Sequence, residues 1–160
     1  ADACKDKTPP KANKPIQIPY SLYFAKNSCW WEDSGVAFIS PEREPDENKW
    51  TLGRMWKITC EQYVHLRRQE GKDWYNHEIY LEEEDDFPIR TITNKEILTP
   101  YNRPSAGYLK TIALGLKEIC HLTTNEKIAE YLIAKYGIKD NFSTEELISI
   151  IVSATTSNTA

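Results

Sequence analysis

PYNRPSAGYLKTIALGLKEIC, residues Pro100 to Cys120, is the stretch in which the hydrophobic pattern changes from that of strands to that of a helix. From Ser105 onward the apolar residues recur at spacings of three and four, which places them on one face of a helix. These residues are Leu109, Ile112, Leu116 and Ile119. The spacing therefore predicts a helix over Ser105–Cys120 with a single apolar stripe.

Two more helices are expected downstream of this one. The segments Thr123-x-x-Glu126 and Ser143-x-x-Glu146 have the spacing of capping boxes, in which two side chains satisfy each other's backbone N–H groups at a helix start. We expect these helices to end near positions 137 and 154.

The residues before Pro100 favour strands. Five segments are rich in β-branched and aromatic residues and are bounded by Pro, Gly, Asp and Asn. They are Ile18–Ala25, Gly35–Ile39, Thr51–Ile58, Trp74–Glu83 and Phe87–Thr93. One helix is expected among them at Cys60–Gln69, because Thr59 and Gln62 form a capping box and Gly71 follows the last turn. The acidic run at 82–86 is typical of a hairpin turn and lacks the spacing of a calcium loop.

This order of elements indicates an α+β fold in which helices cover part of a largely antiparallel sheet. Five short strands must protect their edges, so we expect a small mixed β-barrel, closed or half closed, with flanking helices. We expect one domain at residues 16–154, with a disordered N-terminal segment at 1–15 and a flexible tail at 155–160.

Composition narrows the possible partners. The net charge is -4 and the basic residues form no long block, which argues against nucleic-acid binding. The longest apolar run, Leu147–Ala154, is far shorter than the ~20 residues that a membrane-spanning helix needs. The four cysteines and three histidines lack the spacings of metal ligands. We therefore expect a cytoplasmic protein with reduced thiols, without a metal and without a membrane or nucleic-acid partner.

Glu70 is the first candidate for chemistry. It follows the last turn of the expected helix at 60–69, where the helix dipole disfavours the ionised carboxylate and raises its pKa. A raised pKa suits a general acid or base. Gly71 permits a sharp turn toward the aromatic pair at 74–75, whose rings would desolvate the carboxylate further. The alternative is a solvated side chain balanced by the two preceding arginines.

The second candidate is the polar end of the first expected strand, at Lys26, Asn27 and Ser28. Successive backbone N–H groups at such a position can hold a carboxylate or an oxyanion, and the lysine would attract an acidic substrate. The alternative is an ordinary turn. Tyr75 and Tyr108 can each present a hydroxyl to a pocket, although aromatic residues at these spacings usually pack in the core.

In their chain order these features resemble those of gamma-glutamylcyclotransferase-like proteins. The shared features are the Leu22–Ala25 strand with its polar Ser-containing loop, LRRQEG ending at Glu70-Gly71 with Tyr75 a few residues later, and Pro104-Ser105 with Tyr108 opening a helix. The resemblance covers roughly residues 18 to 135. It is greatest to a bacterial branch in which the loop leads through a Trp to a GVAF-like strand, here Gly35–Phe38.

The resemblance implies a small mixed barrel and an intramolecular reaction. The α-amine of a gamma-glutamyl amine or peptide would attack its own γ-carbonyl, form 5-oxoproline and release the amine, a lyase or acyl-transfer reaction that needs no cofactor. Glu70 falls on the general acid/base of the family. The small-molecule gamma-glutamyl substrate would be bound by Tyr23, Phe24, Ala25, Lys26, Asn27, Ser28, Tyr75 and Tyr108. The protein would be a monomer or a homodimer.

The chain departs from the family at the loop, and this leaves alternatives open. The usual loop is Tyr-Gly-Ser-Asn, whereas residues 25–28 are AKNS and contain no Gly. Either the ligand differs, with Lys26 pairing with an additional carboxylate, or the chain is a catalytically inactive small-molecule or protein binding module on the same fold. A third alternative treats the apolar stripe at 147–152 as a surface for a partner and not as cover for the domain's own sheet.

Overall fold

The long strand β1, Ala12–Ser28, is the centre of the molecule. Its first half pairs antiparallel with β3, Trp50–Lys57, and its second half pairs antiparallel with β2, Ser34–Arg43. The sheet order is therefore β2-β1-β3. Strands β4, His77–Glu84, and β5, Phe87–Thr93, form a separate antiparallel hairpin. The computed structural model describes residues 4–156.

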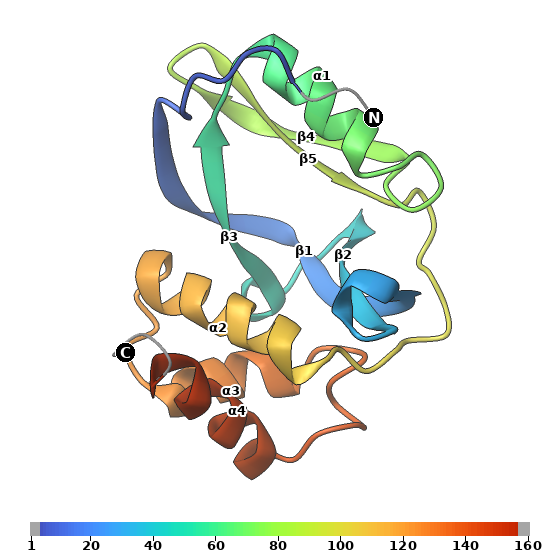
Figure 1. Cartoon of the computed structure of the whole chain (residues 1–160), viewed down its shortest axis with the longest axis vertical. Helices are drawn as coiled ribbons and strands as arrows, with labels where there is room; N and C mark the ends of the chain where they lie inside the picture. Colours follow the sequence, from blue (N-terminus) through green and yellow to red (C-terminus); the bar gives the residue numbers. More distant parts are fainter. Residues whose placement is uncertain (1–3, 157–160) are drawn as a thin grey trace.

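Helices lie at both ends of this arrangement. Helix α1, Cys60–Gln69, lies beside the β4–β5 hairpin at one end (Figure 1). Helices α2, Ala106–Ile119, α3, Asn125–Ile133, and α4, Thr144–Thr156, form a layer at the other end, with β1, β2 and β3 between the two groups (Figure 1). Two short 3-10 helices, η1 at Cys29–Trp31 and η2 at Glu47–Lys49, follow β1 and precede β3.

The main core lies between β1 and the helical layer. Leu22 and Phe24 of β1 pack there against apolar side chains of α2, α3 and α4. The helical members include the stripe residues Leu109 and Leu116. Leu147 and Ile151 of α4 are also fully buried in this core, so most of the apolar stripe at 147–152 covers its own domain, while Val152 is exposed. The predicted amphipathic helix after Pro104 is therefore confirmed.

The α+β class and the antiparallel pairing are confirmed, and the strands of residues 4–156 pair as the β2-β1-β3 sheet and the β4–β5 hairpin. Side chains bridge the two sheets. The hydroxyl of Thr93 on β5 donates to the carbonyl of Ile39 on β2. Lys14 on β1 forms a 2.8 Å ion pair with Glu84 on β4.

Two of the three predicted capping boxes are confirmed, at Thr59 and Ser143. The prediction for Thr123 is wrong by one residue, because the hydroxyl of Thr124 accepts the hydrogen bond from the N–H of Lys127. Adjacent threonines offer the same hydroxyl, so the local pattern does not choose between them. Helix α3 also ends at Ile133, before the expected position 137.

The N-terminal segment is more ordered than its composition predicts. Strand β1 begins at Ala12, inside the stretch expected to be disordered, because this part of the chain pairs with β3. Further upstream, the hydroxyl of Thr59 donates to Asp6 (2.7 Å) and the side-chain amide of Gln62 donates to the carbonyl of Thr8 (2.7 Å). At the other end α4 runs to Thr156, and residues 157–160 of the expected tail lie outside the described part of the chain.

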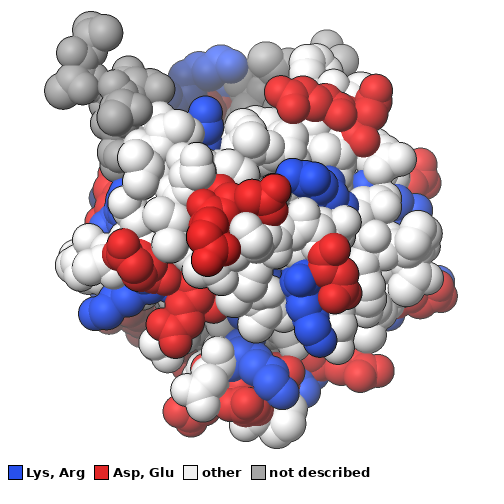
Figure 2. Space-filling model, turned by 90° about the horizontal axis from the view of Figure 1, so that it is seen from below, with Lys and Arg blue, Asp and Glu red and all other residues white. Residues whose placement is uncertain are grey.

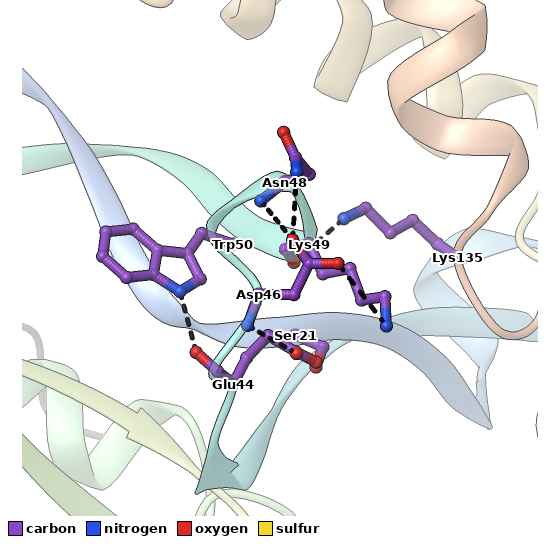
Figure 3. A network of polar contacts seen from close by, with 7 residues as sticks. All are labelled: Ser21, Glu44, Asp46, Asn48, Lys49, Trp50 and Lys135. Carbon is purple, nitrogen blue, oxygen red and sulfur yellow. Dashed lines mark hydrogen bonds and ion pairs between the residues drawn. The ribbon is translucent and has the colours of Figure 1, made fainter.

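A polar network joins β1, the segment before β3 and the helical layer (Figure 3). Glu44 accepts hydrogen bonds from the hydroxyl of Ser21 (2.9 Å) and, through its backbone carbonyl, from the indole N–H of Trp50 (2.8 Å). The ammonium group of Lys135 donates to the carbonyl of Lys49 (3.3 Å) (Figure 3). Lys135 is 6% exposed, so this cation is held inside the protein.

The surface carries both signs of charge. On the face at the bottom of Figure 1, acidic and basic side chains alternate with uncharged ones (Figure 2). None of the helices in residues 4–156 combines the length and the hydropathy needed to cross a membrane.

Candidate functional site

The end of α1 turns the chain back on itself at Glu70. Glu70 is the C-cap residue, and its N–H donates to the carbonyl of Leu66 at 3.1 Å. Gly71 follows with φ = 78°, a left-handed conformation that Gly adopts without steric cost. The N–H of Tyr75 then bonds to the carbonyl of Gly71 at 3.2 Å. This turn brings the aromatic pair at 74–75 back toward the helix end, as the sequence predicts.

An aromatic cluster lies beside this turn. Phe38 on β2 stacks on Tyr75, with ring centroids 4.7 Å apart, and on Tyr23 of β1 at 5.7 Å. Tyr108 of α2 belongs to the same cluster, and the ring of Trp31 lies 4.8 Å from it. The cluster therefore joins three parts of the chain that are far apart in sequence, namely the β1–β2 region, the α1–β4 turn and the first turn of α2.

Two tyrosines of this cluster bind the backbone of the same residue on β2. The hydroxyl of Tyr75 donates to the carbonyl of Ala37 at 3.0 Å, and the hydroxyl of Tyr108 accepts from the N–H of Ala37 at 3.1 Å. The edge of β2 that faces away from β1 is thereby capped by side chains. Tyr108 uses its oxygen as an acceptor here, and the structure shows no residue within 4–156 that accepts the proton of this hydroxyl.

Glu70 acts electrostatically on both tyrosines. Its side chain is exposed, yet desolvation by the neighbouring atoms raises the pKa of the carboxyl group. Burial, followed by the negative charge of Glu70, raises the pKa of Tyr108, and Glu70 also adds to the burial-driven rise in the pKa of Tyr75. Within residues 4–156 the carboxylate of Glu70 has no hydrogen-bond or ion-pair partner. It is therefore free to receive one from a ligand.

The polar loop at the end of β1 is a bulge with a strained residue. The register with β2 shifts between Ala25 and Ser28, and Lys26 has φ = 60°. A lysine in this left-handed region is unfavourable by roughly 1–2 kcal/mol. The side-chain amide of Asn102 holds the loop by donating to the carbonyl of Lys26 (2.9 Å) and to Oδ1 of Asn27 (3.0 Å).

Glycines allow the neighbouring segments to approach this loop. A Cβ on Gly35 would lie 2.3 Å from the carbonyl oxygen of Asn102. A Cβ on Gly137 would lie 2.8 Å from the same oxygen, and Gly137 has φ = 92°. The backbone beyond β1 is therefore packed so closely that side chains other than hydrogen do not fit at these two positions.

The structure brings some of the predicted site residues together. Tyr23, Ala25, Tyr75 and Tyr108 all belong to the aromatic cluster or pack against it. Phe24 belongs to the helical core instead, because successive side chains of a strand point to opposite faces, and its fully buried ring touches the cluster edge-on at Tyr108, with ring centroids 6.3 Å apart. Its N–H and carbonyl are also used, by Tyr136 and Asn102.

The three polar residues of the loop differ in their exposure. Ser28 is buried, Lys26 is half-buried and Asn27 is exposed. Sequence reasoning did not identify Phe38, Trp31 or Asn102 as part of this region. Trp31 and Phe38 belong to the loop and the GVAF-like strand on which the resemblance rests, but the resemblance gave them no role in the site. Asn102 lies just before Pro104-Ser105, next to the Tyr108 motif.

A hollow of about 520 Å³ lies on the other side of Tyr75. It is lined by residues of α1 and of the turn after it, namely Tyr63, Val64, Arg67, Arg68, Lys72, Tyr75 and Asn76. The loop at 23–28 does not line this hollow. Among the described residues no group of three or more His, Cys, Asp or Glu side chains is placed to hold a metal ion.

Among the comparisons with known proteins, those with solved structures give matches. No protein-family model and no curated protein matches the sequence. A solved structure of a gamma-glutamyl cyclotransferase is similar with a TM-score of 0.55 and 20% identity, over 89% of this chain and 86% of that one. The crystal structure of the uncharacterized human protein loc79017 is similar with a TM-score of 0.53 and 20% identity, over 86% of this chain and 82% of that one.

The implied resemblance is thus confirmed for the fold, while the bacterial branch stays a prediction. The two similar structures agree with the observed arrangement of antiparallel strands and flanking helices. The chain therefore has the gamma-glutamyl cyclotransferase-like fold.

Proposed function

We propose that this protein is a cyclotransferase that converts a gamma-glutamyl amine or peptide into 5-oxoproline and a free amine. The observation that supports this most is the carboxyl group of Glu70, which is desolvated, unpaired within residues 4–156 and close enough to Tyr75 and Tyr108 to act on both. A carboxyl group with a raised pKa next to a cluster of aromatic side chains suits acid/base chemistry.

The reaction needs one group that first accepts and then donates a proton. The carboxylate of Glu70 would take a proton from the substrate's α-ammonium, and the resulting amine nitrogen would form a bond to the γ-carbonyl carbon. The bond from this carbon to the leaving nitrogen then breaks, and the protonated Glu70 would return its proton to that nitrogen. The ring nitrogen still carries one proton too many, which it would lose to the regenerated carboxylate of Glu70, and this proton would leave with the released amine, so that the products are neutral-ring 5-oxoproline and an ammonium group. The nucleophile is tethered to the electrophile, so the protein mainly has to orient the substrate.

The surrounding groups have suitable roles. The free proton of the Tyr108 hydroxyl would stabilise the oxyanion that forms on the γ-carbonyl. The loop at 25–28, held by Asn102, would bind the glutamyl head group, with Lys26 and Asn27 at its exposed side. Tyr23 and Tyr75 would form the wall of the site and would exclude water from it.

One observation favours a second candidate, an inactive binding module. Lys26 occupies a left-handed position where the usual family loop has a glycine. Lys26 belongs to the loop that would bind the head group, so its side chain would either reduce the space available to an α-carboxylate or add a charged contact. Such a protein would bind gamma-glutamyl compounds and would not release 5-oxoproline.

Turnover assays with a matched pair of variants separate these candidates. The wild type is incubated with gamma-glutamyl amines, amino acids and peptides, and 5-oxoproline is quantified. We expect Glu70→Gln to lower kcat by at least about a hundredfold, because general acid/base catalysis typically contributes that much. Glu130→Gln, at an exposed carboxylate of α3, is the control and should keep wild-type turnover.

The outcomes are distinct. Equal and negligible turnover by the wild type and Glu70→Gln, together with a ligand-induced rise in Tm, would establish the binding module. Wild-type turnover that is retained in Glu70→Gln would refute Glu70 as the acid/base and would leave the reaction itself in place.

A further inference from the structure

The hollow beside α1 is lined by three cations and by no acidic side chain. Arg67, Arg68 and Lys72 contribute the charge, and Tyr63, Tyr75 and Asn76 contribute hydrogen-bonding groups. Three positive charges in one concave surface repel one another unless an anion neutralises them. A surface of this composition is therefore complementary to a negatively charged group.

The structure provides no internal anion for these cations. Among residues 4–156, none of the three forms an ion pair. Nη1 of Arg67 is buried and has no hydrogen-bond partner in this part of the chain. A buried guanidinium nitrogen without a partner is costly, so it indicates a position that a ligand fills.

Glu78, which binds the lining residue Tyr63, already has partners of its own. Glu78 accepts a hydrogen bond from the hydroxyl of Tyr63 and forms a 3.1 Å ion pair with Arg90. Burial and this carboxylate raise the pKa of Tyr63 to about 12, so Tyr63 remains a neutral group in the hollow. Glu78 therefore does not provide the negative charge that Arg67 lacks.

Tyr75 connects the hollow to the proposed catalytic group, because it lines the hollow and the charge of Glu70 adds to the burial-driven rise in its pKa. Arg68 and Lys72 line the hollow, and Glu70 lies between them in the chain. Tyr75 lines the hollow and also belongs to the aromatic cluster, where its hydroxyl binds Ala37. A substrate whose reacting amide lies at Glu70 can thus extend either toward the 25–28 loop or toward the hollow.

We propose that the hollow is an anion subsite that binds a carboxylate or phosphate-type group on the departing amine. This inference rests on the proposed function, since it assigns the half of the substrate that is released. The glutamyl head would lie at the loop and the anionic end of the leaving amine against Arg67, Arg68 and Lys72. The same charges would disfavour substrates whose leaving group is cationic, such as gamma-glutamyl polyamines.

A matched set of substrates tests this assignment. Gamma-glutamyl-glycine, gamma-glutamyl-glycinamide and the gamma-glutamyl derivative of aminomethylphosphonate have leaving groups of similar size with a carboxylate, a neutral amide and a phosphonate. We expect kcat/KM for the carboxylate to exceed that for the amide by about tenfold or more, as for a hydrogen-bonded charge. The ratio of phosphonate to carboxylate distinguishes a phosphate-type from a carboxylate ligand.

Variants of the hollow show whether its cations cause this preference. Arg67→Gln and Arg68→Gln should each lower the ratio of kcat/KM for carboxylate over amide by about tenfold. Lys127→Gln, which removes an exposed cation of α3, is the control for net charge and should keep the wild-type ratio. The circular dichroism spectrum and the Tm of each variant show that it is folded.

A binding measurement separates failure of the subsite from failure of the proposed function. N-acetylglycine and N-acetylglycinamide are titrated against the protein while the arginine side-chain NMR signals are followed. Shifts at Arg67 and Arg68 with the carboxylate alone support the subsite, even if no substrate is turned over. Turnover with equal rates for the carboxylate and amide substrates would overturn the subsite and leave the proposed function intact. Identical NMR responses to the two probes would also overturn it.

Discussion

At Glu70 several effects act on one carboxyl group. The residue ends a helix, so it lies near the negative end of the helix dipole, and the atoms around it remove part of its hydration. Both effects favour the protonated form. The same position is exposed enough for a ligand to reach it. Local sequence accounts for the first effect, and packing against the aromatic cluster accounts for the second.

The raised pKa of Glu70 has a consequence for stability. The native state keeps this proton at pH values where the unfolded chain, with an ordinary pKa near 4.5, has lost it. Folding is therefore favoured by this group at low pH, and the contribution is lost as pH rises through the native pKa. We expect the stability of the wild type relative to Glu70→Gln to fall as pH increases above 4.5, measured by urea unfolding.

Asp46 is a control whose pKa is shifted in the direction opposite to that of Glu70. Hydrogen bonds from Asn48 hold its pKa below the ordinary value of 3.8, so its contribution is present above that value and is lost as pH falls. The stability difference between the wild type and Asp46→Asn should therefore grow as pH rises. A difference that runs in the same direction for both pairs would contradict the raised pKa of Glu70.

At the scale of elements, strand β2 depends on side chains from two distant segments. Its outer edge carries the carbonyl and the N–H of Ala37, which are bound by Tyr75 from the α1–β4 turn and by Tyr108 from α2. Exposed strand edges promote aggregation, and proteins cover them in various ways. Here the cover consists of the same tyrosines that form the wall of the candidate site, so strand protection and site geometry are linked.

Removing the hydroxyls of Tyr75 and Tyr108 should lower the free energy of unfolding, and the two effects should not be additive. Tyr75→Phe and Tyr108→Phe each leave one polar group of Ala37 without its partner, at a cost of about 1–3 kcal/mol in the free energy of unfolding. The two changes affect the N–H and the carbonyl of one residue, so the double variant should deviate from additivity by at least about 0.5 kcal/mol. Urea unfolding of the single and double variants measures both quantities.

Tyr131 offers a matched control in the helical core. Its hydroxyl accepts a hydrogen bond from the N–H of Leu52 at 3.0 Å, at a site that does not involve Ala37. Tyr131→Phe should also be destabilising, but its effect should add to that of Tyr75→Phe. Strict additivity for the Tyr75 and Tyr108 pair would show that the two hydroxyls do not act on one structural unit.

At the scale of the whole molecule, Lys135 joins the helical layer to the sheet. Its ammonium group is buried, lies 4.4 Å from the ring centroid of Tyr131 and donates to the carbonyl of Lys49. Burial lowers the pKa of Lys135 to about 8 from the ordinary 10.5. A single charged side chain therefore lies where three parts of the fold meet, including Glu44 of the polar network (Figure 3).

This lowered pKa predicts that stability rises with pH above neutrality. Between about 8 and 10.5 the native state has released the lysine proton while the unfolded chain still holds it, so the unfolded state binds more protons and folding becomes more favourable. Lys135→Met has no titrating group at this position. The free energy of unfolding of the wild type minus that of Lys135→Met should therefore increase as pH rises from 8 to 10. Lys127→Met, at an exposed lysine, should show no such shift.

The fold could be predicted from the sequence to a large extent. The strand segments, the helix at 60–69 with its Thr59 cap and the amphipathic helix after Pro104 all follow from contacts between residues a few positions apart. The errors lie where two neighbouring residues offer the same group, as at Thr123, or where distant pairing extends an element, as at the start of β1. Periodicity and capping describe only local interactions.

The sequence by itself thus determined the α+β class, the starts of α1, α2 and α4 and the candidacy of Glu70, because each depends on the chain near it. Only the tertiary structure decided which candidates meet. Tyr75 and Tyr108 reach Ala37 across 38 and 71 residues, and Asn102 reaches Lys26 across 76. Phe24 is directed to the opposite face of β1, and Arg67 and Arg68 of α1 line a hollow without forming an ion pair to any residue of 4–156. Contacts over such separations depend on how strands pair and helices pack, which no local pattern specifies.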